Sequence, residues 1–161
     1  MESNLVKKKA LFLWSEGQKH HQSGDLPRAI DLYTQSIAIY PTAESYTYRG
    51  WAYSFQGRIE DAIQECKKAI AIDPSLGNPY NDIGTYLITL GRIDEAEEWL
   101  QKAKAAVRYD LRHFPYINLG RIYLARGLMV QAAKEFREAL QIFPEEPHCQ
   151  AALEYIEKIL H

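Results

Sequence analysis

The 161-residue sequence predicts an all-α fold, a solenoid built from four helix–turn–helix units and a C-terminal capping helix. The first observation behind it is a glycine that recurs about every 34 residues, at Gly17, Gly50, Gly84 and Gly120. A second glycine and then an alanine follow each of these at constant spacing: Gly24 with Ala29, Gly57 with Ala62, Gly91 with Ala96, and Gly127 with Ala132. A proline closes three of the four units, at Pro41, Pro74 and Pro144. Units of this length cannot bury their apolar faces alone, so they are expected to stack in a row.

The first helix of each unit is expected to carry the first glycine within an apolar face. Apolar or aromatic residues tend to fall four before, one before and three after this glycine, which is one side of a helix. In the fourth unit these residues are Tyr116, Leu119 and Tyr123. The glycine therefore predicts the close approach of a neighbouring helix. The second glycine suits a helix C-terminus that is followed by a tight turn.

The repeated alanine is expected to begin the packed stripe of the second helix in each unit. Small and apolar residues continue from it along one side: Ala62, Cys66, Ala69 and Ile70 in the second unit, and Ala132, Phe136, Ala139 and Leu140 in the fourth. Small residues allow the second helix to lie against the first, so Ala62, Ala96 and Ala132 are predicted to be almost fully buried. The proline ends this helix and orients the next one.

These marks divide one predicted domain, residues 1–161, into units at about 10–42, 43–76, 77–112 and 113–145, with a capping helix over 146–161. In the capping helix Cys149, Leu153, Ile156 and Leu160 share one side, which would cover the exposed end of the stack. The third unit ends in AVRYDLRHFP without a helix-closing proline. Its extra length predicts either a longer second helix or an altered turn.

The pattern Tyr116-x-x-Leu119-Gly120-x-x-Tyr123, followed by Ala132-x-x-x-Phe136 and Pro144, resembles the tetratricopeptide repeat (TPR), with tyrosine in place of the usual tryptophan. The resemblance extends over about residues 10–144. It implies a right-handed α-solenoid whose concave groove binds a peptide segment or helix of a partner protein. A small secretion or assembly chaperone is an alternative role that the same family implies.

Composition and motifs argue against several other classes of protein. The net charge of −2 gives no overall attraction to nucleic acid or anionic membranes, and RNA binding by a helical repeat would need a basic groove. No apolar run reaches the ~20 residues of a membrane span, and the N-terminal run is too short for a signal peptide, so a cytoplasmic protein is expected. The histidines, the two cysteines and the acidic run 94–98 lack the spacing of a metal or catalytic site. We therefore expect no enzyme activity and no cofactor.

The candidate binding residues lie on the side of each first helix opposite to its packed face. Aromatic residues dominate this stripe in the first two units, where exposed rings would be favoured anchors for a partner, although each ring could instead pack between repeats. Polar residues dominate it in the last two units, where they suit a peptide backbone or are simply solvated. The predicted groove residues are Trp14, Gln18, Tyr48, Trp51, Phe55, Asn81, Asp82, Thr85, Asn118 and Arg121.

The resemblance refines the roles of three of these residues. In the family, an asparagine two residues before the glycine often holds a peptide main chain. Asn118 occupies that position, and Asp82 is a close chemical relative there. A clamp for the C-terminal carboxylate of chaperone tails, also found in the family, is disfavoured because only Arg121 matches its residue types. The expected partner is another protein, and self-association is left open.

Overall fold

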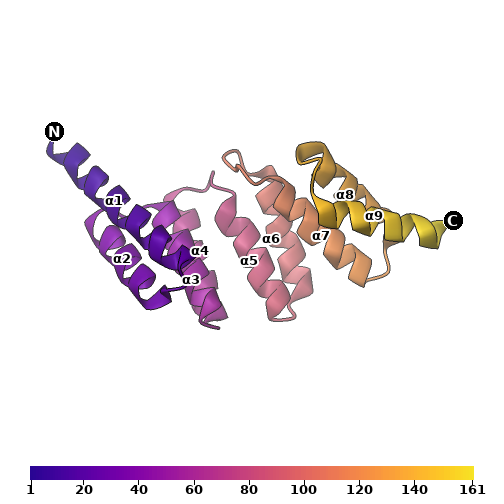
Figure 1. The fold of residues 1–161 in the computed structure, drawn as a ribbon, viewed down its shortest axis with the longest axis horizontal. Helices are drawn as coiled ribbons and strands as arrows, with labels where there is room; N and C mark the ends of the chain where they lie inside the picture. Colours follow the sequence, from indigo (N-terminus) through magenta and orange to yellow (C-terminus); the bar gives the residue numbers. More distant parts are fainter.

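The computed structural model describes residues 1–161 as a row of nine α-helices without β-strands. Figure 1 shows the helices following one another along an elongated molecule, with the two termini at opposite ends. The helices are α1 (Glu2–Gln22), α2 (Leu26–Ile39), α3 (Ala43–Phe55), α4 (Ile59–Ile72), α5 (Asn78–Thr89), α6 (Ile93–Ala105), α7 (His113–Ala125), α8 (Met129–Ile142) and α9 (Pro147–Leu160). None of them is both long enough and apolar enough to span a bilayer.

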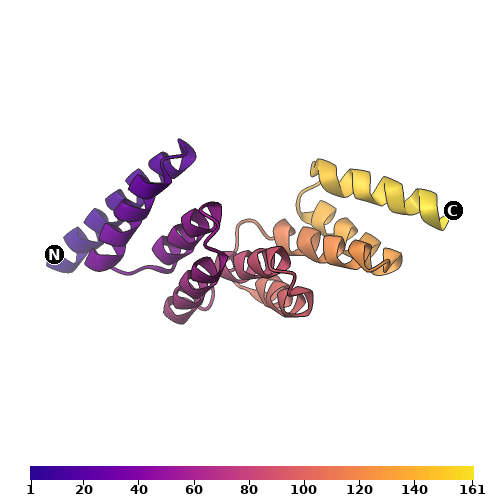
Figure 2. The ribbon, with the colours of Figure 1, turned by 90° about the horizontal axis from the view of Figure 1, so that it is seen from below.

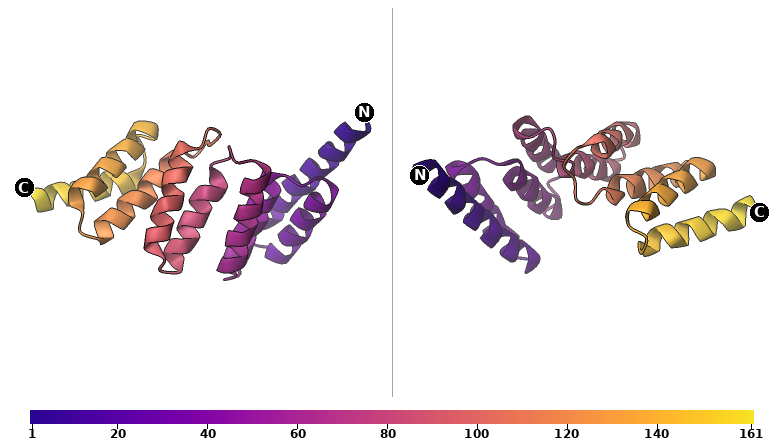
Figure 3. Two further views of the ribbon diagram at one scale, coloured as in Figure 1. Left: turned by 180° about the vertical axis from the view of Figure 1, so that it is seen from behind. Right: turned by 90° about the horizontal axis from the view of Figure 1, so that it is seen from above.

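The helices form four antiparallel pairs, which confirms the predicted all-α solenoid. The most extensive contacts are within the pairs α1–α2, α3–α4, α5–α6 and α7–α8, and the next are between consecutive pairs. Seen from below, the row is bent, and α1 and α9 rise on the same side of the central pairs (Figure 2). The views from behind and from above show the same curvature (Figure 3). The first helices α3, α5 and α7 supply the residues of a common hollow.

The last helix pair shows why the repeated small residues are needed. A Cβ atom on Gly120 would lie 2.6 Å from Cε1 of Phe136, so only glycine allows α8 to approach α7 this closely. Gly127 has a φ of 74°, the left-handed conformation that glycine adopts at low cost in the turn between the two helices. Ala132 is fully buried where the helices cross, as are Ala62 and Ala96, which confirms the prediction for all three.

Replacing Ala132 with leucine is expected to destabilise the protein by about 1–3 kcal/mol, because the added side chain must displace its neighbours in a filled core. Thermal or urea unfolding would measure this effect. The matched control is Ala151→Leu, which adds the same group at an exposed position of α9 and should leave the unfolding midpoint almost unchanged. Equal midpoints for Ala132→Leu and the wild type would contradict the helix register.

The connection between the third and fourth pairs is an altered turn, and the alternative of a longer second helix is wrong. Helix α6 ends at Ala105, and residues 106–112, here called the connecting loop, fold back onto the preceding turn. The Gly77 N–H donates to the Arg108 carbonyl, and the Arg108 N–H donates to the Ser75 carbonyl, both at 3.0 Å. The Arg108 guanidinium also pairs with Asp73 at 2.6 Å and with Glu44 at 3.0 Å. The loop therefore bonds to two segments that precede it in the chain.

Helix α9 covers the last pair with part of its length. Cys149 and Ile156 are fully buried in one core cluster with Phe136, and Leu153 packs against that cluster. Leu160, expected on the same buried side, is 49% exposed, because the end of α9 projects beyond the last pair (Figure 1). At the other terminus, α1 begins at Glu2 and its first residues, Leu5 among them, are exposed.

Candidate binding groove

A hollow of about 510 Å³ lies across the first helices of the second, third and fourth pairs. We call it the central pocket. Its walls come from α3, α5, α7 and the connecting loop. It gathers seven of the ten predicted groove residues, which are Tyr48, Trp51, Asn81, Asp82, Thr85, Asn118 and Arg121. A neighbouring hollow of about 530 Å³, the second pocket, shares Thr85, Asn118 and Arg121 with it and extends to Asp94 and Arg126. The two hollows form one continuous groove.

Two asparagine side chains connect α5 to α7 at the floor of this groove. The Asn118 Nδ2 donates to Asn81 Oδ1 at 3.0 Å and lies 3.4 Å from Thr85 Oγ1. Thr85 in turn donates to the Asn81 carbonyl at 3.1 Å, and Asn81 is only 6% exposed. Asn81 therefore has a structural role, because it is buried and connects α5 to α7. Asn81 Nδ2 and Asn118 Oδ1 make no hydrogen bond within the protein, which leaves one donor and one acceptor for a ligand.

The central pocket also contains one acid and one base that have no partner. The Asp82 carboxyl forms no hydrogen bond or ion pair with the protein, and its burial raises its pKa to about 7. Arg121 is exposed and forms no ion pair, although it lines both pockets. By contrast, Glu44 near the start of α3 and Asp94 in the second pocket are paired with Arg108 and Arg126. Asp82 and Arg121 therefore remain available to charged groups of a ligand.

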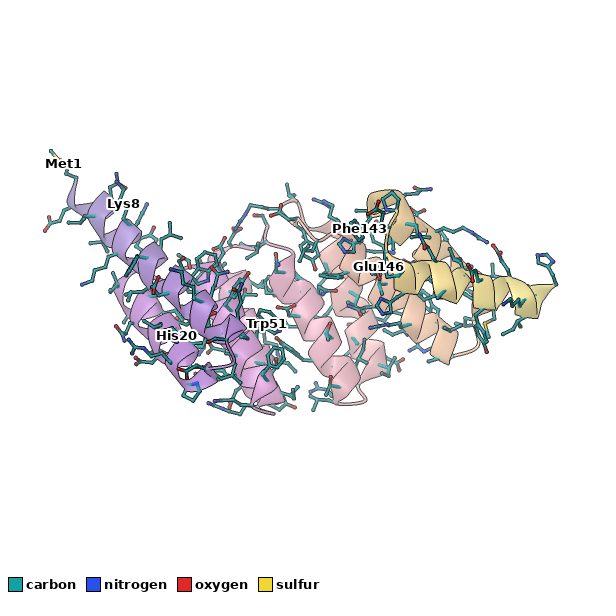
Figure 4. All side chains as sticks on the ribbon, in the orientation of Figure 1. Met1, Lys8, His20, Trp51, Phe143 and Glu146 are labelled. Atoms are coloured by element: carbon teal, nitrogen blue, oxygen red, sulfur yellow. The ribbon has the colours of Figure 1, made fainter.

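The predicted aromatic anchors divide into packed and exposed rings. Trp14 packs edge-on against Tyr48, with ring centroids 5.3 Å apart, and against the core of the first two pairs. Trp51 is 43% exposed and Phe55 is 61% exposed, and their ring centroids lie 5.5 Å apart. Figure 4 shows Trp51 projecting on the side where α3 faces the third pair. Trp14 therefore packs between repeats, which was the alternative left open for each ring, whereas Trp51 offers an accessible face in the central pocket.

The structure places the remaining predicted residues outside the central pocket. Phe55 lies beyond Trp51 near the C-terminal end of α3, and Gln18 is half-buried on α1 and lines neither pocket. Trp14 lines a separate hollow between α1 and the start of α3, together with Lys7 and Glu44. Seven of the ten predicted residues therefore form one contiguous group in the central pocket. The other three, Trp14, Gln18 and Phe55, lie outside it on α1 and α3.

Sequence reasoning missed two contributors to the groove, and it did not predict the packing of His21 beneath Trp51. Tyr109 and Leu111 of the connecting loop line the central pocket, and the longer third unit was the only signal of their position. His21 is 8% exposed beneath Trp51, with ring centroids 4.4 Å apart, and its Nδ1 lies 3.3 Å from the Tyr33 hydroxyl oxygen. Burial lowers the pKa of His21, so the ring is neutral near pH 7 and serves as a support for the indole.

The geometry of the groove suits binding. No group of three His, Cys, Asp or Glu side chains lies close enough together to hold a metal ion. The lining instead combines aromatic faces, an amide pair and two separated charges on the rigid helices of a solenoid. Such a lining can hold a chain segment by its backbone and by a few side chains.

Comparisons with known proteins agree with this architecture. Models described as tetratricopeptide repeat match residues 43–76, 80–108 and 116–147. The small glutamine-rich tetratricopeptide repeat-containing protein 2 of Mycosarcoma maydis is 37% identical over 95 residues. That alignment spans 58% of this chain and 27% of the relative, so the chain corresponds to about a quarter of the relative's length.

Two solved structures resemble the whole fold or most of it. PilF of Pseudomonas aeruginosa superimposes with a TM-score of 0.87 at 21% identity, over 94% of this chain and 68% of that one. The second TPR of Spaghetti (RPAP3), bound to the HSP90 peptide SRMEEVD, superimposes with a TM-score of 0.61 at 27% identity, over 66% of this chain and 99% of that one. The helix pairs, the glycine and alanine positions and the three matching models together show that this chain belongs to the tetratricopeptide repeat family.

Proposed function

We propose that this protein is an interaction module that acts by binding, and that it holds a peptide segment or helix of a partner protein in the groove formed by the central and second pockets. One observation carries the proposal. Within a single hollow, the first helices present an exposed indole, an unused amide donor and acceptor, and two charges without partners. Polar groups that bond to one another within the fold need no ligand. The groups in this hollow lack such partners and are therefore free to bind one.

The chemistry of the groove favours a polypeptide ligand. An amide donor beside an amide acceptor complements the C=O and N–H groups of an extended main chain. Trp51 provides a large aromatic surface of the kind that dominates binding energy at protein interfaces. A structural relative of this chain is a TPR bound to a peptide, which supports the same mode of binding. RNA is a poor match, because Arg121 is accompanied by Asp82 in the central pocket.

Replacing Arg121 with alanine is expected to weaken binding by about tenfold or more, since hydrogen bonds to charged groups contribute about 1.5–3 kcal/mol. Peptides would first be selected on the wild-type protein from a displayed random library, and their dissociation constants would then be measured by calorimetry. Trp51→Ala should also weaken the selected peptides, because Trp51 is the exposed aromatic anchor. Arg121→Ala should leave the melting temperature almost unchanged, because that side chain is exposed and forms no ion pair. Trp51→Ala should lower it, because the indole packs against His21 and Phe55.

The matched control is Arg137→Ala, which removes an exposed arginine from α8, outside both pockets. Selected peptides should bind this variant as they bind the wild type. If they bind the Arg121 and Trp51 variants equally well, the ligand uses another surface and the groove proposal is wrong.

A further inference from the structure

We propose that the central pocket contains a subsite for a cationic side chain, lysine or arginine, with Asp82 as the counter-charge and aromatic rings as the walls. This inference rests on the proposed function and specifies the chemistry of the segment that the groove takes. It assigns to Asp82 a different role from that of the neighbouring asparagines, because an ionised carboxylate can only accept hydrogen bonds and attracts positive charge.

The first argument is that Asp82 lacks the basic partner that the nearby acids Glu44 and Asp94 possess. Glu44 is 3.0 Å from Arg108, and Asp94 is 2.5 Å from Arg126. Asp82 lines the central pocket without any hydrogen bond or ion pair to the protein, and Arg121, which lines the same pocket, forms no ion pair with it. A carboxyl group that is partly withdrawn from water without a partner is costly, and such groups are concentrated at functional sites.

The second argument comes from the groups that surround Asp82. Cys66 on α4, Tyr86 on α5 and Tyr109 in the connecting loop each have a raised pKa, for which burial is the largest cause and the Asp82 charge a further one. These three groups are neutral near pH 7 and supply no positive charge. Asp82, with a pKa of about 7, is therefore the group of this cluster that ionises under physiological conditions. A ligand cation would supply the missing counter-charge in a poorly solvated place, where attraction is strongest.

The third argument is the aromatic lining of the same hollow. Tyr48 and Trp51 from α3, Tyr109 from the connecting loop and Phe114 from α7 all line the central pocket. Ring faces attract lysine and arginine cations, and they also accommodate the methylene stem of these side chains. Arg121 lines the junction with the second pocket. The groove thus offers Asp82 to a cation and Arg121 to an anion.

A metal ion or an anion fits the surroundings of Asp82 in the central pocket poorly. Asp82 belongs to no group of three His, Cys, Asp or Glu side chains that could hold a metal ion. An anionic group would be repelled once Asp82 ionises. A primary ammonium or guanidinium group, which needs one counter-charge and tolerates aromatic neighbours, matches the lining.

The test uses the whole protein and two blocked tripeptides as probes, acetyl-Ala-Lys-Ala-amide and its norleucine analogue, which has an apolar chain of similar length without the charge. Binding would be followed by Trp fluorescence and by carbon NMR of the Asp82 carboxyl at pH 6 and pH 8. The lysine probe should bind about fivefold more tightly at pH 8 than at pH 6, because Asp82 ionises between these values. A saturating lysine probe should lower the pKa of Asp82 by about one unit.

Asp82→Asn should abolish this pH dependence and weaken the lysine probe, while the affinity for the norleucine probe should not fall. The matched control is Asp110→Asn, which neutralises an exposed acid of the connecting loop and should behave as the wild type. The proposal is overturned if about 10 mM lysine probe leaves the pKa of Asp82 unchanged, or if Asp82→Asn binds the probe as the wild type does. Library-selected peptides that depend on Trp51 and Arg121 but are indifferent to Asp82→Asn would refute this subsite and leave the groove function intact.

Discussion

Replacing Glu65 with alanine is expected to lower the free energy of unfolding by about 3–5 kcal/mol, the cost of leaving one charge of a buried pair without its partner. Glu65 on α4 is 4% exposed. It accepts hydrogen bonds from Arg49 Nε at 2.7 Å and from the Arg49 terminal nitrogen at 3.1 Å. The Arg49 side chain is itself only 13% exposed, so water cannot fully replace the carboxylate. Urea unfolding at pH 7 would measure the loss.

Two comparison variants sharpen this result. Glu60→Ala removes an acid from the same helix whose pairing with Arg92 is long, at 3.5 Å, and exposed, so little change is expected. The double variant Arg49→Met with Glu65→Leu replaces both charges by apolar groups and should recover most of the lost stability. If Glu65→Ala and Glu60→Ala destabilise the protein equally, the burial of the Arg49–Glu65 pair has no energetic consequence.

Replacing Asp82 with asparagine is expected to stabilise the protein in alkaline solution by about 2–4 kcal/mol. A pKa difference of one unit between the folded and unfolded states corresponds to about 1.4 kcal/mol of stability. The carboxyl is partly exposed, so the expected gain is smaller than the whole pKa difference would give. The pKa of Asp82 is about 7 in the folded protein and 3.8 in the reference state. The folded state therefore holds the proton more tightly, and the stability of the wild type falls as the pH rises from about 4 to about 7.

The difference in the free energy of unfolding between Asp82→Asn and the wild type should vary over this range of pH. It should be absent below about pH 4, where Asp82 is protonated in both states, and should reach its full size above about pH 8. Urea unfolding at pH 3.5, 6 and 9 would follow it, with Asp110→Asn as a control in which the charge is exposed. An equal difference between Asp82→Asn and the wild type at all three values would show that Asp82 is not desolvated in the folded state.

The sequence predicts most of the fold because its signals are local and repeated. Gly120 and Ala132 mark the crossing of two adjacent helices, and the contact that each permits lies within one unit. Four copies of this pattern reinforce one another. The stripe of seven residues in the central pocket was predictable for the same reason, since the packed face of a helix also fixes the opposite face.

The features that the sequence did not predict depend on contacts between different units. Asn118 bonds to Asn81 across α5 and α7, and His21 packs beneath Trp51 across α1 and α3. No periodic mark encodes such pairs, because side chains far apart in the chain must first be brought together by stacking. The sequence predicts an altered turn here as one of two alternatives, but it does not predict how the connecting loop folds. That fold depends on backbone bonds to residues 75–77, which any residue type with an N–H and a C=O could make.

The connecting loop changes how the middle of the solenoid loses its structure. Repeats that contact only their neighbours unfold approximately one at a time from the ends, as in a one-dimensional chain of independent blocks. Arg108 interrupts this behaviour, because its main chain bonds to the turn before α5 and its guanidinium holds Glu44 on α3. Opening the third pair must therefore break the bonds that the connecting loop, which leads into the fourth pair, makes to the second pair and to the turn before α5. We therefore expect the segments that line the central pocket to open together and fraying to be concentrated in the outer helices, so that a ligand meets a surface that is already ordered.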